Sequence, residues 1–288
     1  MLIDTHAHLN FNAYKEDSDE VIRRSLGGGV WMINVGSQYK TSVRAVEIAQ
    51  KYEKGVYAAI GLHPIHLAEG IFKTKIDMEE IAFKTNEESF DYERYKELSK
   101  NPKVVAIGEI GLDYWYKPKT TKKIEEFKEK QKAALLEQLK LAEELNLPVI
   151  FHCRAAHEDL ITILNTRYKI QNTRLRGVVH CYTGTWEQAE KYLEMGFYIG
   201  FNGIIFKLDL DEVIRKTPME RILLETDCPY LIPPSVAEVL TKATPSVGRN
   251  EPLYVKYVAE RIAQIKKIEI SQIHEATTLN AKYLFGIE

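Results

Sequence analysis

Two histidines stand two residues apart in the apolar segment that opens the chain, residues 1–9. Alternate side chains of a β-strand project to the same side, so His6 and His8 point to one place if this segment is a strand. Neutral imidazole is a common protein ligand for divalent metals, and two imidazoles can share one ion. Because such pairs also arise without function, a metal site requires partners elsewhere in the chain.

Those partners are present, because a histidine or a carboxylate follows most of the later apolar runs. They are His63, Glu109, His152, His180 and Asp227. A single catalytic zinc takes three protein ligands and an open position, so four imidazoles and two carboxylates predict two ions. The predicted ligands are His6, His8, Glu109, His152, His180 and Asp227. We expect Glu109 to bridge the ions and Asp227 to accept a proton from the attacking water.

The elements that carry these residues follow a regular pattern. Short apolar runs rich in Val and Ile alternate with charged segments of helical periodicity, as in repeated βα units. The expected strands are 2–5, 31–35, 56–60, 104–107, 149–151, 177–179, 197–199 and 222–224, and expected helices include 42–52, 124–145, 157–168 and 186–194. Eight such units predict an α/β fold, the (β/α)8 TIM barrel, with parallel strands and an active site at their C-terminal ends. An open doubly wound sheet is the alternative.

One interval departs from this pattern. Residues from about 68 to 100 are charged and contain no strand-like run, so we expect a long insertion there that adds a helix to the third unit. No linker or low-complexity segment divides the chain. We therefore expect a single domain over residues 1–288.

Composition limits the partners of the protein. Lys and Arg number 39 against 41 Asp and Glu, a formal charge of -2, so any recognition of phosphate must be local. Three cysteines without a secretory signal favour a cytoplasmic location. No apolar stretch approaches the roughly 18 residues of a membrane span. We expect a soluble protein with no membrane association and no obligate protein partner.

Seven motifs resemble those of the TatD family of metal-dependent deoxyribonucleases, within the amidohydrolase-like metal-dependent hydrolases. They are Ile3-Asp4-Thr5-His6-Ala7-His8-Leu9, Gly61-Leu62-His63-Pro64, Ile107-Gly108-Glu109-Ile110-Gly111-Leu112-Asp113-Tyr114, Pro148-Val149-Ile150-Phe151-His152-Cys153-Arg154, His180-Cys181-Tyr182-Thr183-Gly184, Leu224-Glu225-Thr226-Asp227-Cys228-Pro229-Tyr230-Leu231 and Arg249-Asn250-Glu251-Pro252. The resemblance spans nearly the whole chain and implies a TIM barrel, a two-ion site on the same six ligands, and hydrolysis of nucleic-acid phosphodiesters. Cys153, Cys228 and the long insertion depart from the family pattern without removing a ligand.

The expected activity is therefore that of a TatD-like deoxyribonuclease, a hydrolase acting on ester bonds. Glu109 and Asp227 are the expected catalytic carboxylates, and the nucleophile is a water activated by two metal ions. Imidazole and carboxylate together accept zinc, manganese and, less readily, magnesium. Two ions are thus predicted, and zinc, manganese and magnesium are the candidate metals.

Loops after the strands contain the predicted substrate contacts. His63, Arg154 and Arg249 can donate hydrogen bonds to a phosphate, with carbonyl bonding or ion pairing as their structural alternatives. Aromatic side chains there can stack on unpaired bases or pack as lids; they are Tyr114, Trp115, Tyr116 and Tyr182. A near-neutral chain favours short contact over tracking along duplex DNA. We expect an exonuclease on single-stranded DNA ends, with nicked or abasic DNA and RNA as further substrates.

Two other functions use the same residues. A small-molecule amidohydrolase or lactonase would activate water at the same metal site. A lysine able to be carboxylated on the fourth or fifth strand would favour that class, but Glu109 and His152 occupy those places. A nucleic-acid-binding barrel with a degenerate site is the second alternative, and the complete ligand set disfavours it.

Overall fold

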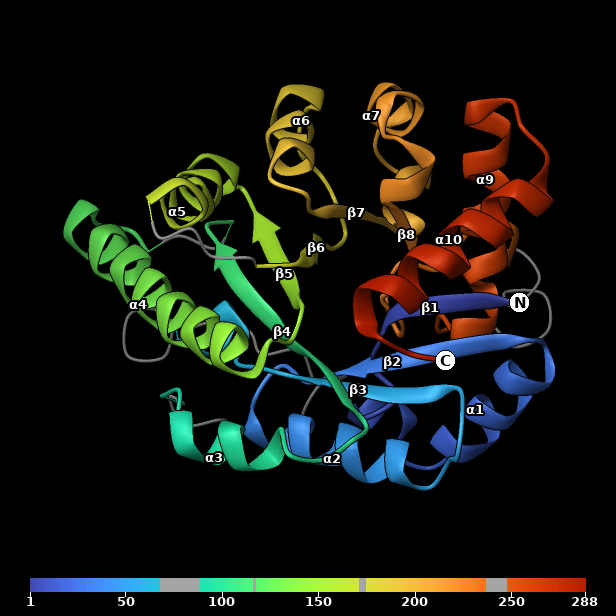
Figure 1. The fold of residues 1–288 in the computed structure, drawn as a ribbon, viewed down its shortest axis with the longest axis horizontal. Helices are drawn as coiled ribbons and strands as arrows, with labels where there is room; N and C mark the ends of the chain where they lie inside the picture. The colour runs from blue at the N-terminus through green and yellow to red at the C-terminus, as the bar shows by residue number, and fades with distance from the viewer. Residues whose placement is uncertain (68–88, 116–117, 171–174, 237–247) are drawn as a thin grey trace.

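Eight parallel β-strands alternate with helices in the computed structural model, and each strand is hydrogen-bonded to the next in chain order (Figure 1). The structure describes residues 1–67, 89–115, 118–170, 175–236 and 248–288. The strands are β1 (Leu2–Ala7), β2 (Val30–Val35), β3 (Val56–Ile60), β4 (Val104–Asp113), β5 (Val149–Arg154), β6 (Gly177–Val179), β7 (Tyr198–Phe201) and β8 (Ile222–Leu224). This order of parallel strands confirms the predicted TIM barrel.

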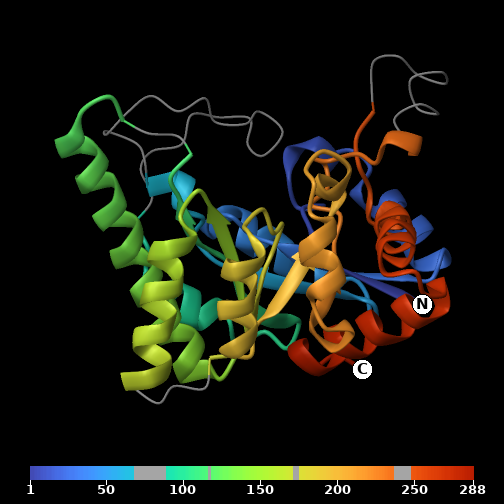
Figure 2. The same ribbon diagram turned by 90° about the horizontal axis from the view of Figure 1, so that it is seen from above.

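The helices lie outside the strands in both ribbon views (Figures 1 and 2). They are α1 (Ser18–Gly27), α2 (Tyr39–Gln50), α3 (Tyr92–Leu98), α4 (Thr121–Leu145), α5 (His157–Ile170), α6 (Trp186–Glu194), α7 (Asp211–Lys216), α9 (Val255–Lys266) and α10 (Ile270–Phe285). Short 3-10 helices are η1 (Asn12–Tyr14), η2 (Pro64–Leu67), η3 (Gly203–Phe206), η4 (Met219–Arg221) and η5 (Pro252–Tyr254). Local sequence sets several helix ends. Thr185 and Gln188 form a capping box at the start of α6, and Asn146 ends α4 in the left-handed conformation.

Both faces of the strands are buried, as is usual in a parallel sheet covered by helices. All residues of β1, β6 and β8 are buried, which explains why β6 and β8 are continuous apolar runs in the sequence. One core cluster joins strands to the surrounding helices. A smaller one packs strand residues such as Ile33 and Ile150 against Leu284 and Phe285 of α10. Asn280 of the same helix donates to the carbonyl of Ile222, where β8 begins, so α10 covers the N-terminal end of the barrel.

The predicted end of β4 at residue 107 is wrong, because the strand continues to Asp113. Glycines at 108 and 111 resemble turn signals in the sequence. In the structure β5 passes so close that a Cβ atom on Gly111 would lie 1.9 Å from the His152 carbonyl oxygen. Gly111 also has a φ of 151°, which L side chains rarely adopt. The glycines therefore permit close strand pairing, and Glu109 lies within the strand.

Side chains help to close the barrel between β1 and β8. A parallel bridge joins Ala7 and Cys228. Earlier in the same two segments, the Asp4 carboxylate accepts hydrogen bonds from the Thr226 backbone N–H at 2.8 Å and from the Thr226 hydroxyl at 2.6 Å. Because Thr226 directly precedes Asp227, this closure fixes the position of a predicted metal ligand.

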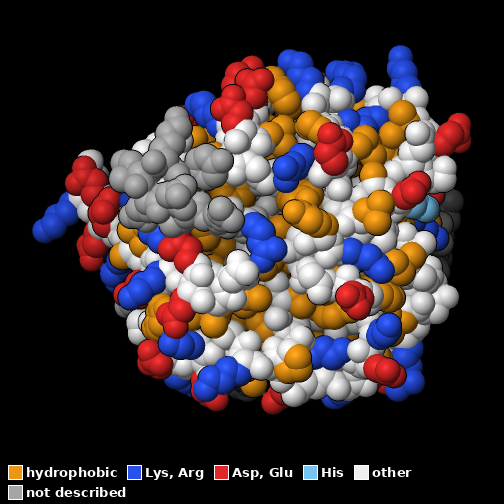
Figure 3. All heavy atoms as spheres, in the orientation of Figure 1, with side chains coloured by type: hydrophobic (Ala, Val, Ile, Leu, Met, Phe, Trp, Pro, Cys, Tyr) orange, Lys and Arg blue, Asp and Glu red, His pale blue; other side chains and the backbone are white. Residues whose placement is uncertain are grey.

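Only part of the predicted insertion can be compared with the structure, since residues 68–88 lie outside the described part. In the remainder, α3 lies between β3 and β4 and forms the crossover of the third unit, so the helix added by an insertion stays a prediction. Among the described residues, no helix is both long and apolar enough to cross a membrane. On the face shown in Figure 3, acidic and basic side chains are interspersed, in keeping with the formal charge of -2.

Candidate metal centre

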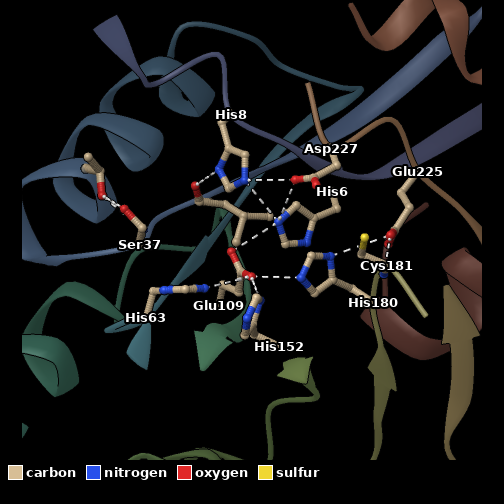
Figure 4. A network of polar contacts seen from close by, with 12 residues as sticks. His6, His8, Ser37, His63, Glu109, His152, His180, Cys181, Glu225 and Asp227 are labelled. Carbon is tan, nitrogen blue, oxygen red and sulfur yellow. Dashed lines mark hydrogen bonds and ion pairs between the residues drawn. The ribbon is translucent and has the colours of Figure 1, made fainter. Parts of the chain in front are cut away.

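The six predicted ligands meet at the C-terminal ends of the strands (Figure 4). They come from β1 and the residues after it (His6, His8), β4 (Glu109), β5 (His152), and the segments following β6 (His180) and β8 (Asp227). The ligand atoms of these six residues and of the adjacent His63 form overlapping groups, each within 4.8 Å: His6, His8 and Asp227; His6, Glu109 and His180; and His63, Glu109 and His152. We call the six predicted ligands the six-residue cluster. His63 adjoins it.

The histidine pair on β1 forms one half of the six-residue cluster. The Nε2 atoms of His6 and His8 lie 3.1 Å apart. The nearest oxygen of Asp227, Oδ1, is 3.4 Å from Nε2 of His8 and 3.9 Å from that of His6. These three side chains can therefore converge on one ion.

Glu109 joins this half to the other. Its Oε1 lies 2.7 Å from Nδ1 of His152 and 2.7 Å from Nε2 of His180. Its Oε2 lies 3.4 Å from Nε2 of His6. Ligand atoms about 2.1 Å from one ion, at angles of about 90–110°, are about 3.0–3.4 Å apart, and the distances within the cluster lie on both sides of this range, from 2.7 to 3.9 Å.

The second nitrogen of each ring indicates whether the first is available to a metal. His8 donates from Nδ1 to the Val35 carbonyl at 2.9 Å, which leaves the Nε2 lone pair facing the cluster. His152 has the opposite arrangement, since its Nε2 lies 3.0 Å from Oδ2 of Asp113 and its Nδ1 faces Glu109. Such partners for the outer nitrogen are usual for metal-binding histidines. The donor set therefore fits divalent metal ions.

The charges of the cluster also suit cation binding. Burial raises the pKa of the Glu109 carboxyl, but the neighbouring His180, His63 and His6 outweigh it and hold that pKa well below its ordinary value. Burial likewise lowers the pKa of His152, but hydrogen bonds to Asp113 and Glu109 raise it to about 9. The carboxylates are thus ionised at neutral pH. Metal binding would release the proton held by His152.

The model of the family described as TatD related DNase matches residues 3–286 of the chain. The chain belongs to this family. Among its relatives, YabD of Bacillus subtilis (strain 168), an uncharacterized metal-dependent hydrolase, is 42% identical over 292 residues, covering 100% of both chains. The 3'-5' ssDNA/RNA exonuclease TatD of Escherichia coli (strain K12) is 31% identical over 292 residues, covering 99% of both.

A solved structure agrees with this assignment to the TatD family. The crystal structure of YJJV, a TatD homolog from Escherichia coli K12, superimposes with a TM-score of 0.79 at 29% sequence identity. The match covers 100% of this chain and 98% of that one. The family resemblance predicted from the motifs is confirmed, and with it a metal-dependent hydrolase.

Two carboxylates that the sequence analysis did not single out support ligands in this TatD-family chain. Asp113 contacts His152, as described above. Glu225 lies beside His180, with its Oε1 3.5 Å from Nδ1, and accepts hydrogen bonds from the Cys181 N–H at 2.5 Å and from Asn202 at 3.1 Å. Both acids stand in the motifs that contain the ligands. The signal that could have found them is the need of each ligand histidine for an acceptor at its outer nitrogen.

His63 lies against the six-residue cluster but differs from its members in its hydrogen bonds. Its Nδ1 accepts a hydrogen bond from the Ile65 N–H at 3.0 Å, so a neutral ring carries its proton on Nε2. That Nε2 lies 3.4 Å from Oε1 of Glu109. A protonated nitrogen cannot ligate a metal, but it can donate to an anion. The geometry therefore fits the predicted role in substrate binding better than metal ligation.

The other predicted substrate contacts differ in their positions. Arg154 is exposed at the end of β5. Tyr182 is fully buried, and its hydroxyl donates to the Thr185 carbonyl at 2.6 Å, so its ring offers no surface to a base. Arg249 donates to Asp17 and to the Ala13 carbonyl, an ion-pair role rather than a place in the cluster.

Two glutamines on one face of α4 hold strand ends that carry site residues. Gln131 accepts from the Asp113 N–H at 2.8 Å and donates to the Asp113 carbonyl at 2.9 Å. Seven residues later, Gln138 accepts from the Leu62 N–H at 2.7 Å and donates to the Leu62 carbonyl at 3.1 Å. Each side chain thereby replaces a backbone partner beside His152 or His63.

Replacing Gln138 by leucine is expected to lower the free energy of unfolding by about 2–4 kcal/mol, since it leaves a buried N–H and a buried carbonyl of Leu62 without partners. Urea denaturation would measure the change. The control is Glu137→Leu, one position away on the exposed side of α4, where we expect a change within about 0.5 kcal/mol. Equal stabilities of the two variants would contradict a structural role for the hydrogen bonds between Gln138 and Leu62.

Proposed function

We propose that this TatD-family protein binds two divalent ions through the six-residue cluster and hydrolyses phosphodiester bonds of nucleic acids. The observation that carries the proposal is the position of Glu109. Its two carboxylate oxygens contact histidines of both halves, His152 and His180 through Oε1 and His6 through Oε2. This is the arrangement expected of a ligand shared by two ions.

The six-residue cluster would supply both the metal ions and the proton acceptor of the reaction. Two divalent ions bound there would lower the pKa of a water molecule and neutralise negative charge on the phosphate oxygens. Asp227 accepts the proton of the attacking water, since its side chain is 16% exposed against 7% for Glu109. Burial raises the pKa of the Asp227 carboxyl, but the neighbouring imidazoles of His8, His6 and His180 outweigh it and hold that pKa below its ordinary value, so the carboxylate is ionised and able to accept.

Binding of the phosphodiester falls to donors around the cluster. His63 directs its Nε2 proton toward Glu109 and can donate to a phosphate oxygen placed there. Arg154 supplies a planar guanidinium, which can hold a phosphate through two hydrogen bonds. Both residues therefore act in orienting substrate, and neither has to carry the proton of the reaction.

Single-stranded ends are the proposed substrate. Relatives that carry a specific activity in their names are 3'-5' ssDNA/RNA exonucleases. The formal charge of -2 gives the chain no general attraction to duplex DNA. Zinc, manganese and magnesium all suit a mixed imidazole and carboxylate set. A cytoplasmic location and the absence of an obligate protein partner remain predictions.

The small-molecule amidohydrolase or lactonase remains the second candidate. Its chemistry needs the same ions and the same proton acceptor, so the six-residue cluster alone does not distinguish it. Relatives named as exonucleases favour the nuclease.

Chelation and readdition of metal test the proposal directly. We expect the chelated protein to cleave no end-labelled oligonucleotide, and a single added metal to restore cleavage of single-stranded DNA before that of intact duplex. Gel analysis of products over time would separate loss of terminal nucleotides from internal cleavage. Parallel assays with an aryl ester, a lactone and an amide cover the second candidate. If one of these compounds is hydrolysed while every oligonucleotide stays intact with every metal, the nuclease proposal is wrong and the small-molecule amidohydrolase or lactonase takes its place.

A further inference from the structure

An exposed tryptophan and an arginine stand together beside the six-residue cluster. Trp115 follows the end of β4, and Arg154 is the last residue of β5. The guanidinium carbon of Arg154 lies over the indole ring, 4.7 Å from its centroid. The strands bring them together, because Asp113 is opposite Arg154 in the ladder and the Tyr114 N–H donates to the Arg154 carbonyl at 2.9 Å.

The exposure of Trp115 contrasts with that of nearby aromatic residues. Its side chain is 59% exposed, whereas Tyr114 and Tyr182 are 4% and 0% exposed. At this exposure the indole leaves aromatic surface open to a ligand beside the six-residue cluster. A guanidinium over one face of the indole also stabilises this position of the ring through a cation–π contact and leaves the opposite face for a ligand.

Backbone and side-chain contacts connect this pair to the metal centre. Asp113 accepts a hydrogen bond from the Trp115 N–H on Oδ1 at 2.9 Å, while its Oδ2 lies 3.0 Å from Nε2 of His152. Arg154 is two residues beyond His152 on a regular strand, so both side chains project to the same side, about 6.6 Å apart along the strand. A phosphodiester at the cluster therefore has its neighbouring nucleoside within reach of Trp115.

We propose that Trp115 and Arg154 form a subsite for one unpaired nucleobase and the phosphate next to it. The proposal rests on the nuclease function proposed above and specifies which part of a strand the protein contacts. An indole face stacks on any base, which gives affinity without sequence preference. The guanidinium over the other face of the indole can bind phosphate, so the pair matches the two chemical parts of a single-stranded nucleotide.

Removing the indole and removing the base should have coupled effects. The probes are short single-stranded DNA oligonucleotides, one intact and others with a tetrahydrofuran abasic residue at one of the three 3'-terminal positions. For Trp115→Ala we expect KM on the intact strand to rise about 5- to 150-fold. On the strand that lacks the stacked base we expect the same substitution to have little further effect, because the interaction is already absent. Trp115→Phe keeps an aromatic face and should recover part of the affinity.

Three comparisons make the test decisive. Tyr283→Ala removes another exposed aromatic side chain, 76% exposed on α10, and should leave KM unchanged for every strand. Arg154→Lys should weaken intact and abasic strands alike, since both keep the phosphate. Fluorescence anisotropy of the same strands measures binding even without cleavage, so an inactive nuclease and an absent subsite are distinguishable. An equal loss by Trp115→Ala on all strands, or no loss on any, would overturn the subsite.

Discussion

Glutamine in place of Glu109 is expected to reduce phosphodiester hydrolysis by about 10³-fold or more, which corresponds to about 4 kcal/mol of lost transition-state stabilisation. Glutamine has nearly the same volume and can still accept from one ring, so the shape of the site is retained. It has no negative charge, and a neutral amide oxygen is a weak substitute for a carboxylate shared by two ions. Loss of the charge therefore removes metal affinity from both halves together.

Metal content and stability would check this expectation independently of activity. With metal at about 100 times its Kd, the wild type should gain about 2.7 kcal/mol of stability, and the Glu109→Gln variant should gain little. The control is Glu143→Gln, which removes a partly buried carboxylate that accepts two hydrogen bonds from Arg167 and is not a member of the cluster. That variant should keep both activity and the metal-dependent gain. A Glu109→Gln protein that still bound two ions per chain would contradict the shared-ligand role.

The architecture was predictable from sequence because parallel strands buried on both faces consist largely of consecutive apolar residues. Four of the eight expected strands agree with the structure to within one residue at each end, for example β3 at 56–60 and β8 at 222–224. β4 was predicted too short because glycine ordinarily signals a turn. Only the proximity of β5 shows that Gly111 serves strand pairing instead.

The six-residue cluster was predictable for a related reason. In a TIM barrel the ends of all strands meet, so the position of a residue along its own strand is enough to place it near the others. Asp113 and Glu225 were not found, because their role depends on which nitrogen of a neighbouring histidine faces the metal. That orientation is a property of side-chain packing and hydrogen bonding, which spacing in the sequence does not determine.

Substrate contacts were the least predictable part of the site. Tyr182 and Trp115 both follow strand ends, yet one is fully buried and the other is 59% exposed. The difference comes from neighbours on other elements: the rings of His157 and Tyr192 pack around Tyr182. Arg249 likewise forms its ion pair with Asp17, more than two hundred residues earlier. Such pairings depend on tertiary structure, so a loop residue's type alone could not distinguish binding from packing.

Asparagine in place of Asp227 should separate proton transfer from metal binding. We expect kcat to fall by about 10²–10⁴-fold, the usual contribution of a positioned general base, because an amide cannot accept the proton of the attacking water. Metal should still bind in part, through the imidazoles of His6 and His8, whose Nε2 atoms are 3.1 Å apart. The fold should tolerate the change, since Asp227 has a φ of 56° and asparagine adopts this left-handed conformation more readily than most residues.

The measurements are kcat, KM and the Kd for metal, compared with Asp211→Asn, which removes a carboxylate that pairs with Arg261 at 3.0 Å. That control should leave all three near the wild-type values. For Asp227→Asn the loss should lie in kcat and persist at saturating metal, because the missing function is acceptance of a proton. If saturating metal restored full activity, Asp227 would be a ligand alone, and the proton would have to pass to another base. Among the described carboxylates of the cluster that base would be Glu109, whose 7% exposure makes it less accessible to water than Asp227 at 16%.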